Sequence, residues 1–382
     1  RAYNAEEYQK EKFAAANDKL TRLNLFVNRL MAILNPIMMG ISSGLSVAIY
    51  WIGAYVINDA APIARLPLFS DMIVFMSYAM QVVMGFLLMG ALFIVLPRTM
   101  VSAKRINQVL DLHSSIQNPA QVQLADENLK GQVEFKDVTF RYAANSEAVI
   151  EHVSFRAEAG QIVAFIGSTG SGKSTLVNLF PRFYDVSAGE ILVDCVNVQD
   201  YDLKDLRNKV GYIPQKAVLF SGDVKGNLDF GQSQETPLSE QAMWQALELA
   251  QSKNFIEDKE AGLESEVAQG GTNFSGGQRQ RLAIARALAR KPEILIFDDS
   301  FSALDYKTDR ILRQVLAEKT QSMTKLIVAQ RISTIMDADL ILVLDQGKVV
   351  GQGTHKELLA SNEVYQEIAY SQLSKEELEH GK

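Results

Sequence analysis

Gly167-Ser168-Thr169-Gly170-Ser171-Gly172-Lys173-Ser174 is the stretch that decides the fold of this 382-residue chain. It fits the phosphate-loop pattern G-x-x-x-x-G-K-[S/T]. The apolar run 162–166 before it predicts a buried strand, and residues 175–180 after it predict the start of a helix. The glycines allow backbone N–H groups to curl around phosphates at the positive end of that helix. We therefore expect an α/β P-loop fold in which these eight residues and Thr175 bind nucleotide, Lys173 reaches the β- and γ-phosphates, and Ser174 binds Mg²⁺.

A second motif follows more than a hundred residues later. Residues 294–297 are four apolar residues, and Asp298 and Asp299 follow them. Such a run predicts a buried parallel strand. A carboxylate at its end can hold the Mg²⁺ shell in P-loop NTPases. Asp298 is therefore a candidate ligand of Mg²⁺ and nucleotide.

Between the two motifs lies Asn273-Phe274-Ser275-Gly276-Gly277-Gln278. Ser275 and the glycines predict the start of a helix that stops at Pro292, and this helix N-terminus suits an anion. Together the three segments resemble the ATP-binding cassette (ABC) family, whose signature reads L-S-G-G-Q; here Phe274 replaces the leucine. The resemblance covers nearly the whole chain and is far more specific than the phosphate loop alone. It implies that Ser275, Gly277 and Gln278 face the γ-phosphate of ATP held by a partner cassette.

Composition excludes several classes of function. The net charge of −7 leaves no electrostatic footprint for nucleic acid. A single cysteine, Cys195, excludes an internal disulfide and suits a reducing compartment. Four widely spaced histidines predict no metal cluster.

Two uncharged stretches, of 29 residues at 30–58 and 26 residues at 72–97, are long enough to span a bilayer. Core helices of a soluble domain are the alternative, although two such runs are rare in globular domains. The loop between them has Arg65 as its only basic residue, whereas basic residues flank the pair: Arg22, Arg29, Arg98, Lys104 and Arg105. The positive-inside rule then predicts a hairpin with both ends in the cytoplasm. We expect an integral protein of a bacterial cytoplasmic membrane, in contact with lipid, with its nucleotide-binding domain in the cytoplasm.

The expected organisation is an all-α transmembrane segment joined to an α/β cassette that carries a helical subdomain between about 220 and 290. We expect the C-terminal part of an ABC transmembrane domain at 1–112, a polar linker at 113–130, the cassette at 131–372 and a polar tail at 373–382. Cassette strands are expected at 133–135, 191–193, 210–213, 326–328 and 340–344, with a helix at 241–250. The opening residues 1–7 resemble the segment ahead of the fifth membrane helix of ABC exporters. Since those have six helices per half, we expect an N-terminally truncated fragment that holds the last two.

Met72, Met76, Met80 and Met84 recur every four residues along the second span and so share one side of a helix. A flexible thioether surface would suit loosely specified hydrophobic substrates. The alternative is that these side chains pack against protein or face lipid.

Further positions match the ABC family by place and chemistry. The resemblance implies that Tyr142 stacks on adenine and that Gln215 contacts Mg²⁺ and links the site to the membrane helices. It also implies that residues 302–305 form the D-loop of a dimer interface. Residues 264–267 resemble the X-loop of exporters, with an exposed polar turn as the alternative.

Two positions depart from the family pattern. Asp299 stands where the family usually has the glutamate that polarises the attacking water, and the shorter side chain retracts the carboxylate by about 1.5 Å. Misplacement by about 1 Å can reduce a rate about 10²-fold. Gln330 replaces the switch histidine and cannot carry its positive charge. These two are the candidate catalytic residues.

The two departures together are typical of heterodimeric ABC exporters in which one ATP site is degenerate. We therefore expect an ATP-binding and ATP-hydrolysing half-transporter whose own site is impaired, and whose signature completes the site of a homologous second half. The substrate could be a drug or other small molecule, a lipid or a peptide. Three alternatives stay open: a homodimeric exporter with slow hydrolysis, a non-transporting ATP-binding regulatory subunit, and a soluble ABC ATPase, against which the two spans argue.

Overall fold

The computed structural model describes residues 4–126, 129–231 and 237–373. These residues divide into two compact units, 1–113 and 114–382, which are considered separately. Beyond Leu373, the expected polar tail lies outside the described residues.

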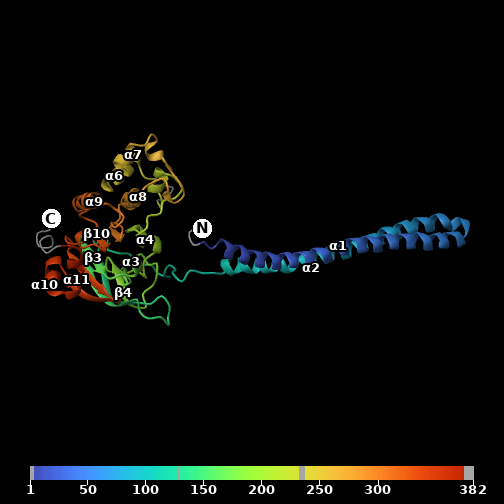
Figure 1. The fold of residues 1–382 in the computed structure, drawn as a ribbon, viewed down its shortest axis with the longest axis horizontal. Helices are drawn as coiled ribbons and strands as arrows, with labels where there is room; N and C mark the ends of the chain where they lie inside the picture. The colour runs from blue at the N-terminus through green and yellow to red at the C-terminus, as the bar shows by residue number, and fades with distance from the viewer. Residues whose placement is uncertain (1–3, 127–128, 232–236, 374–382) are drawn as a thin grey trace. The chain divides into compact units, whose positions relative to one another are not determined.

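The first unit is a helical hairpin. Helix α1 (Glu6–Asp59) and helix α2 (Arg65–Leu110) run side by side and are joined through the short 3₁₀ turn η1 (Pro62–Ala64) (Figure 1). Both predicted spans lie inside these helices, which continue beyond the spans to Glu6 at one end and to Leu110 at the other. Segments Pro36–Asp59 and Pro62–Leu110 are long and apolar enough to cross a membrane, and almost none of their side chains is buried within the hairpin. A helix satisfies its own backbone hydrogen bonds, as a membrane-spanning segment must.

The methionine row of α2 partly packs against α1. The Met72 side chain lies against Gly53, and the Ser42 hydroxyl lies 3.3 Å from Met80 Sδ. Met84, in contrast, is 66% exposed. Within the hairpin, the packing interpretation therefore holds for Met72 and Met80.

The second unit is built on two sheets. The larger has the strand order β12-β11-β3-β10-β9-β6 and is parallel except for the pairing of β11 with β12. Its strands are β3 (Ile162–Gly167), β6 (Val210–Ile213), β9 (Ile294–Asp298), β10 (Thr324–Val328), β11 (Leu340–Asp345) and β12 (Lys348–Gly353). The smaller sheet is antiparallel and contains β1 (Val133–Phe140), β2 (Ile150–Ala157), β4 (Ala188–Val193) and β5 (Val196–Asn197). A two-stranded ribbon pairs β7 (Gly222–Asp223) with β8 (Glu266–Val267).

Helices cover the larger sheet and form a subdomain of their own. The subdomain contains α5 (Val224–Leu228), α6 (Glu240–Leu249), α7 (Lys253–Glu257) and α8 (Gly276–Ala289), with the 3₁₀ turns η2 (Gly262–Glu264) and η3 (Gln269–Gly271). Figure 1 shows α6 and α7 set apart from strands β3 and β10. The remaining elements are α3 (Lys173–Leu179), α4 (Leu203–Asn208), α9 (Tyr306–Lys319), η4 (Ile332–Thr334), α10 (His355–Ser361) and α11 (Glu363–Gln372).

Strand β3 shows why this sheet is stable. Its central side chains are fully buried and alternate between two cores, as the period of two of a strand requires. Val163 and Phe165 join the core between the two sheets, whereas Ala164 and Ile166 join the core beneath the helices. A strand buried on both faces is a near-continuous apolar run, which is the pattern that precedes the phosphate loop.

The predicted strands are confirmed, and the clearest predicted helix is α6. Strands β2 and β12 were not predicted. The stretch between α2 and β1 has no helix or strand among its described residues. Two hydrogen bonds join it to the cassette. Asn118 Oδ1 accepts from the Leu203 N–H at 2.8 Å, and the Gln123 N–H donates to Asp200 O at 2.9 Å.

A buried ion cluster ties β4, β6 and β9 together and provides a test of cassette stability. The Asp194 carboxylate is fully buried and accepts from Lys209 Nζ at 2.9 Å, while Lys209 also lies 2.7 Å from Glu293. We expect Lys209→Met to lower the free energy of unfolding by about 3 kcal/mol, because it leaves a buried carboxylate without its cation. The measurement is chemical denaturation of the purified chain followed by tryptophan fluorescence.

Lys348→Met is the matched control. Lys348 pairs with Glu151 at 3.1 Å, but its side chain is 62% exposed. A solvated pair of this kind contributes at most about 1 kcal/mol. Equal losses in the two variants would contradict the assignment of stability to the buried cluster.

Candidate functional site

Four neighbouring strands of the larger sheet end at one edge. In the parallel register, Val328 of β10 lies opposite both Phe165 of β3 and Asp298 of β9, and Ile213 of β6 lies opposite Phe297. The residues that follow these strands therefore meet at the carboxyl edge, where ligands bind in open α/β sheets. They are the phosphate loop, Gln215, Asp298 with Asp299, and Gln330.

The phosphate loop connects β3 to α3. Gly172 begins the helix with φ of +94°, and a Cβ there would lie 2.6 Å from the Ile150 side chain, so only glycine fits. Lys173 is buried, and its ammonium group donates to the carbonyl oxygens of Gly167 at 2.9 Å and Ser168 at 2.7 Å. Burial lowers the pKa of Lys173, while the charges of the neighbouring carboxylates Asp299 and Asp298 oppose that shift. The loop thus holds a cation at the N-terminus of a helix, which suits a phosphate.

Ser174 and Asp298 are brought together as a candidate Mg²⁺ site. The Ser174 hydroxyl donates to Asp298 Oδ1 at 2.7 Å. Mg²⁺ keeps several waters and takes only one or two protein oxygens plus phosphate, so a hydroxyl with a carboxylate fits it. Among the described residues no cluster of three or more His, Cys, Asp or Glu side chains offers an all-protein metal cage. The donor set therefore fits a metal bound together with nucleotide.

Tyr212 is a member of this site that the sequence did not reveal. Its hydroxyl lies 3.2 Å from Asp298 Oδ2 and donates to Asn178 Oδ1 at 2.8 Å. Burial raises the pKa of Tyr212 well above its usual range, and the Asp298 charge adds to the shift, so the hydroxyl stays protonated. The group that orients the metal-binding carboxylate is thus a neutral donor.

Two glutamine side chains, of Gln215 and Gln330, hold the Asp299 carboxylate by hydrogen bonds. Gln215 Nε2 donates to Asp299 Oδ2 at 2.9 Å, and Gln330 Nε2 donates to the same oxygen at 2.6 Å. The carboxylate is only 6% exposed. Burial raises the pKa of Asp299, the Gln215 hydrogen bond opposes that shift, and the charge of Asp298 adds to it. Gln215 therefore lies against Asp299, and no hydrogen bond joins it to Ser174 or Asp298 within the described residues.

Tyr142 lies beside the start of α3. Its hydroxyl is 3.0 Å from Thr175 Oγ1, and its ring meets Phe140 and Tyr184 edge to face at centroid distances of 4.9 and 5.3 Å. Tyr142 is 54% exposed, so one side of the ring is available to a base. The adenine contact expected of Tyr142 from the sequence stays a prediction.

The signature segment begins α8. Ser275 accepts from the Gln278 N–H at 3.2 Å while the Gln278 side chain accepts from the Ser275 N–H at 2.9 Å, which is a capping box. Phe274 points inward, 3% exposed, with the Lys259 ammonium 4.8 Å from its ring. Within the described part of the chain, no hydrogen bond joins Ser275 or Gln278 to the phosphate loop. Ser275 is exposed, and Gly277 and Gln278 are half-buried.

A family profile described as ABC transporter matches residues 150–302, and one described as ABC transporter transmembrane region matches residues 1–121. The chain belongs to the ABC transporter family. An uncharacterized ABC transporter ATP-binding protein of Mycobacterium tuberculosis is 41% identical over 372 residues, which are 97% of this chain and 63% of that protein. An ATP-dependent lipid A-core flippase of Xanthomonas oryzae is 36% identical over 96% of this chain and 60% of its own length.

A solved structure of a bacterial Atm1-family ABC exporter with ATP bound has the same fold. Its TM-score is 0.84 at 28% identity, and the match covers 98% of this ABC transporter chain and 64% of the other. This chain therefore spans slightly less than two thirds of the relatives that it matches. Its transmembrane region makes it a membrane protein, and its cassette has the ABC exporter fold.

Proposed function

We propose that this chain is the ATP-binding half of an ABC exporter that moves a drug or other small molecule, a lipid or a peptide out across a membrane. The observation that carries the proposal is the 2.7 Å contact of Ser174 with Asp298, which brings together the two residues that would hold Mg²⁺ beside bound ATP. The bacterial flippase and exporter relatives favour export as the coupled work. The cassette would lie in the cytoplasm, since basic residues flank the hairpin.

At this site the chain's own residues would act by position and charge, as phosphoryl transfer requires. Lys173 would stabilise the β- and γ-phosphates, Tyr142 would stack on the base, and Ser174 and Asp298 would hold Mg²⁺. That ion, when bound, would neutralise charge on the phosphate oxygens. Gln215 would report the state of the site to the rest of the chain.

The ATP site of this chain is proposed to hydrolyse ATP slowly. Asp299 would take the position of the general base, yet its Oδ2 atom already accepts two amide hydrogen bonds. Both bonds would occupy this oxygen and hinder it from accepting a proton from water. Gln330 supplies no positive charge in place of the family's histidine. ATP would therefore bind here and persist.

A homologous second half-transporter is the proposed partner. The exposed capping box at Ser275 and Gln278 would complete the partner's ATP site, so that ATP joins the two cassettes and hydrolysis separates them. A homodimer with slow hydrolysis is the runner-up. A regulatory subunit that binds ATP without transporting anything would differ in solute flux: a reconstituted pair would bind ATP and move no substrate.

Lys173→Ala tests the nucleotide site directly. We expect ATP affinity to fall at least about tenfold, because a charge-assisted contact to phosphate is removed. The measurement is equilibrium binding of a fluorescent ATP analogue to the purified chain with Mg²⁺. Lys204→Ala, at an exposed position on α4, is the matched control and should bind as the unmodified chain does. Unchanged affinity in Lys173→Ala would contradict the assignment.

A further inference from the structure

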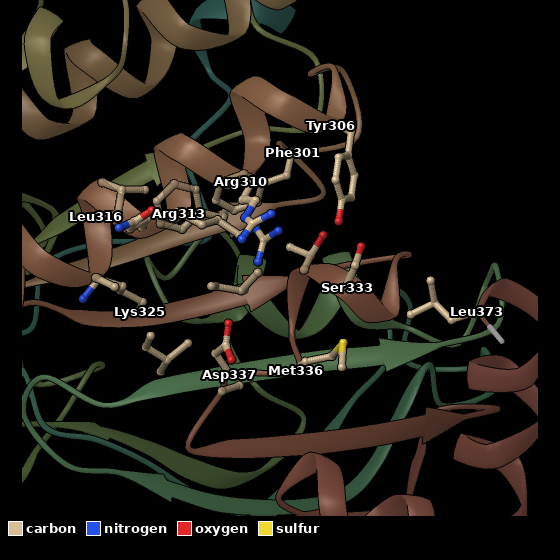
Figure 2. A pocket seen from close by; sticks show the side chains of 17 residues that line it. Phe301, Tyr306, Arg310, Arg313, Leu316, Lys325, Ser333, Met336, Asp337 and Leu373 are labelled. Carbon is tan, nitrogen blue, oxygen red and sulfur yellow. The ribbon is translucent and has the colours of Figure 1, made fainter. Parts of the chain in front are cut away.

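A cavity of about 540 Å³ lies in the cassette between α9 and the segment 333–338. None of the proposed ATP-site residues lines it. Its volume falls in the range of small-molecule sites. We call it the α9 pocket and define it by Phe301, Arg310, Arg313, Ile327, Ser333 and Met336. Figure 2 shows both arginines directing their guanidinium groups into the space between α9 and the segment that carries Ser333 and Asp337.

The lining of the α9 pocket contains more basic than acidic side chains. Three basic residues line it, Arg310, Arg313 and Lys325, against one acidic residue, Asp337. Arg313 is paired with the buried Asp309 at 3.1 Å. Arg310 has no hydrogen bond or ion pair with any described residue, although it faces the cavity. Its five N–H donors are therefore available to an anion.

Lys325 contributes charge without a direct counter-ion. Its ammonium group is 2.7 Å from Thr320 O and 3.0 Å from Met323 O, and the residue is 3% exposed. Burial lowers the pKa of Lys325 to about 8, while the charge of Asp339 opposes the shift, so the amine is mostly charged at pH 7. These backbone oxygens engage the Lys325 ammonium group, which leaves Arg310 as the cation available to a ligand in the pocket.

Much of the remaining lining of the α9 pocket is apolar. Phe301, Leu316 and Ile327 are buried, and Met336 is half-buried. We propose that the α9 pocket binds a small amphipathic carboxylate, with the carboxylate at Arg310 and the apolar body against Phe301, Ile327 and Met336. Guanidinium groups bind carboxylates by two parallel N–H bonds, and an apolar wall with few polar groups is the usual composition of such sites.

The walls of this pocket connect to the ATP site. The segment with Ser333 follows Gln330 directly, and Arg331 Nη2 contacts Ser302 O at 3.5 Å, just ahead of α9. Gln372 Nε2 donates to Gln330 O at 2.8 Å. A bound carboxylate that holds this segment would therefore bias Gln330, whose amide contacts Asp299. This coupling rests on the proposed ATP site, whereas the binding itself does not.

The binding test uses the full chain and 4-phenylbutyrate as the probe, with the neutral 4-phenylbutanamide beside it, measured by isothermal titration calorimetry. We expect the carboxylate to bind at least about tenfold more tightly than the amide, and Arg310→Met to abolish that difference. Lys307→Met, an exposed change on the same helix outside the pocket, should retain it. Ala317→Phe, which fills the cavity from α9, should weaken both compounds.

Equal affinity for the two compounds, or unchanged affinity in both Arg310→Met and Ala317→Phe, would overturn the proposal. Titration without ATP tests the pocket alone, and ATP binding without the probe tests the proposed function alone. If the chain binds both ATP and 4-phenylbutyrate, coupling requires ATP to change the affinity for the probe by the same factor as the probe changes the affinity for ATP.

Discussion

Asp299→Glu combined with Gln330→His is expected to raise ATP hydrolysis at this chain's own site by roughly 10²-fold. The longer side chain advances the carboxylate by about 1.5 Å toward the phosphates. At the same time, replacing Gln330 removes the amide that lies 2.6 Å from Asp299 Oδ2. Histidine also restores a group that can carry positive charge near the γ-phosphate. Together these changes remove one of the two amide hydrogen bonds to this oxygen and lengthen the side chain that would polarise water.

The measurement requires a pair in which the other site is silent. We would assemble this chain with its partner half after removal of the partner's phosphate-loop lysine, and record kcat with saturating ATP. Each single substitution is the control. We expect the effects of the two substitutions on kcat to be non-additive, because the side chains of residues 299 and 330 are hydrogen-bonded to each other. Unchanged kcat in the double variant, with ATP affinity intact, would count against the proposal that these residues make the site slow.

The site could be located from the sequence because each of its parts follows a short apolar strand. Strands β6 and β9 have the expected bounds, since β6 is a largely buried run that ends before Pro214 and β9 is a buried run that ends at Asp298. The same signal is weak elsewhere. Strand β12 is Lys-Val-Val-Gly-Gln-Gly, exposed on alternate residues and containing two glycines, so no apolar run marks it. Helices α5 and α7 are five residues long and too short to show a helical period.

The hydrogen-bond pattern of the site was beyond the sequence for a different reason. Residues 215, 299 and 330 are far apart in the chain, and only the register of β6, β9 and β10 brings their side chains to one point. Tyr212 belongs to the site because its hydroxyl faces Asp298, yet a tyrosine in a strand predicts nothing more than burial. Which atom accepts from which donor depends on side-chain rotamers that pattern and propensity do not determine.

Ser275→Ala is expected to reduce ATP turnover of the assembled pair about 10²-fold, whereas Asp299→Asn should change it less than about twofold. The serine is proposed to face the partner's ATP, where loss of one donor to developing negative charge costs about 10²–10³ in rate. Asp299, in contrast, would belong to a site that already contributes little. The measurement is steady-state ATP hydrolysis by the reconstituted pair.

Ser275 also caps α8, so the test must separate catalysis from folding. Its hydroxyl accepts from the Gln278 N–H, and alanine at an N-cap costs about 1 kcal/mol, whereas glycine costs only a few tenths. Ser275→Gly therefore removes the hydroxyl but keeps most of the helix stability. If Ser275→Gly turns over ATP as slowly as Ser275→Ala, the hydroxyl acts on the nucleotide of the partner. If instead Asp299→Asn is the more damaging change, this chain supplies its own base, and the homodimer becomes the better description.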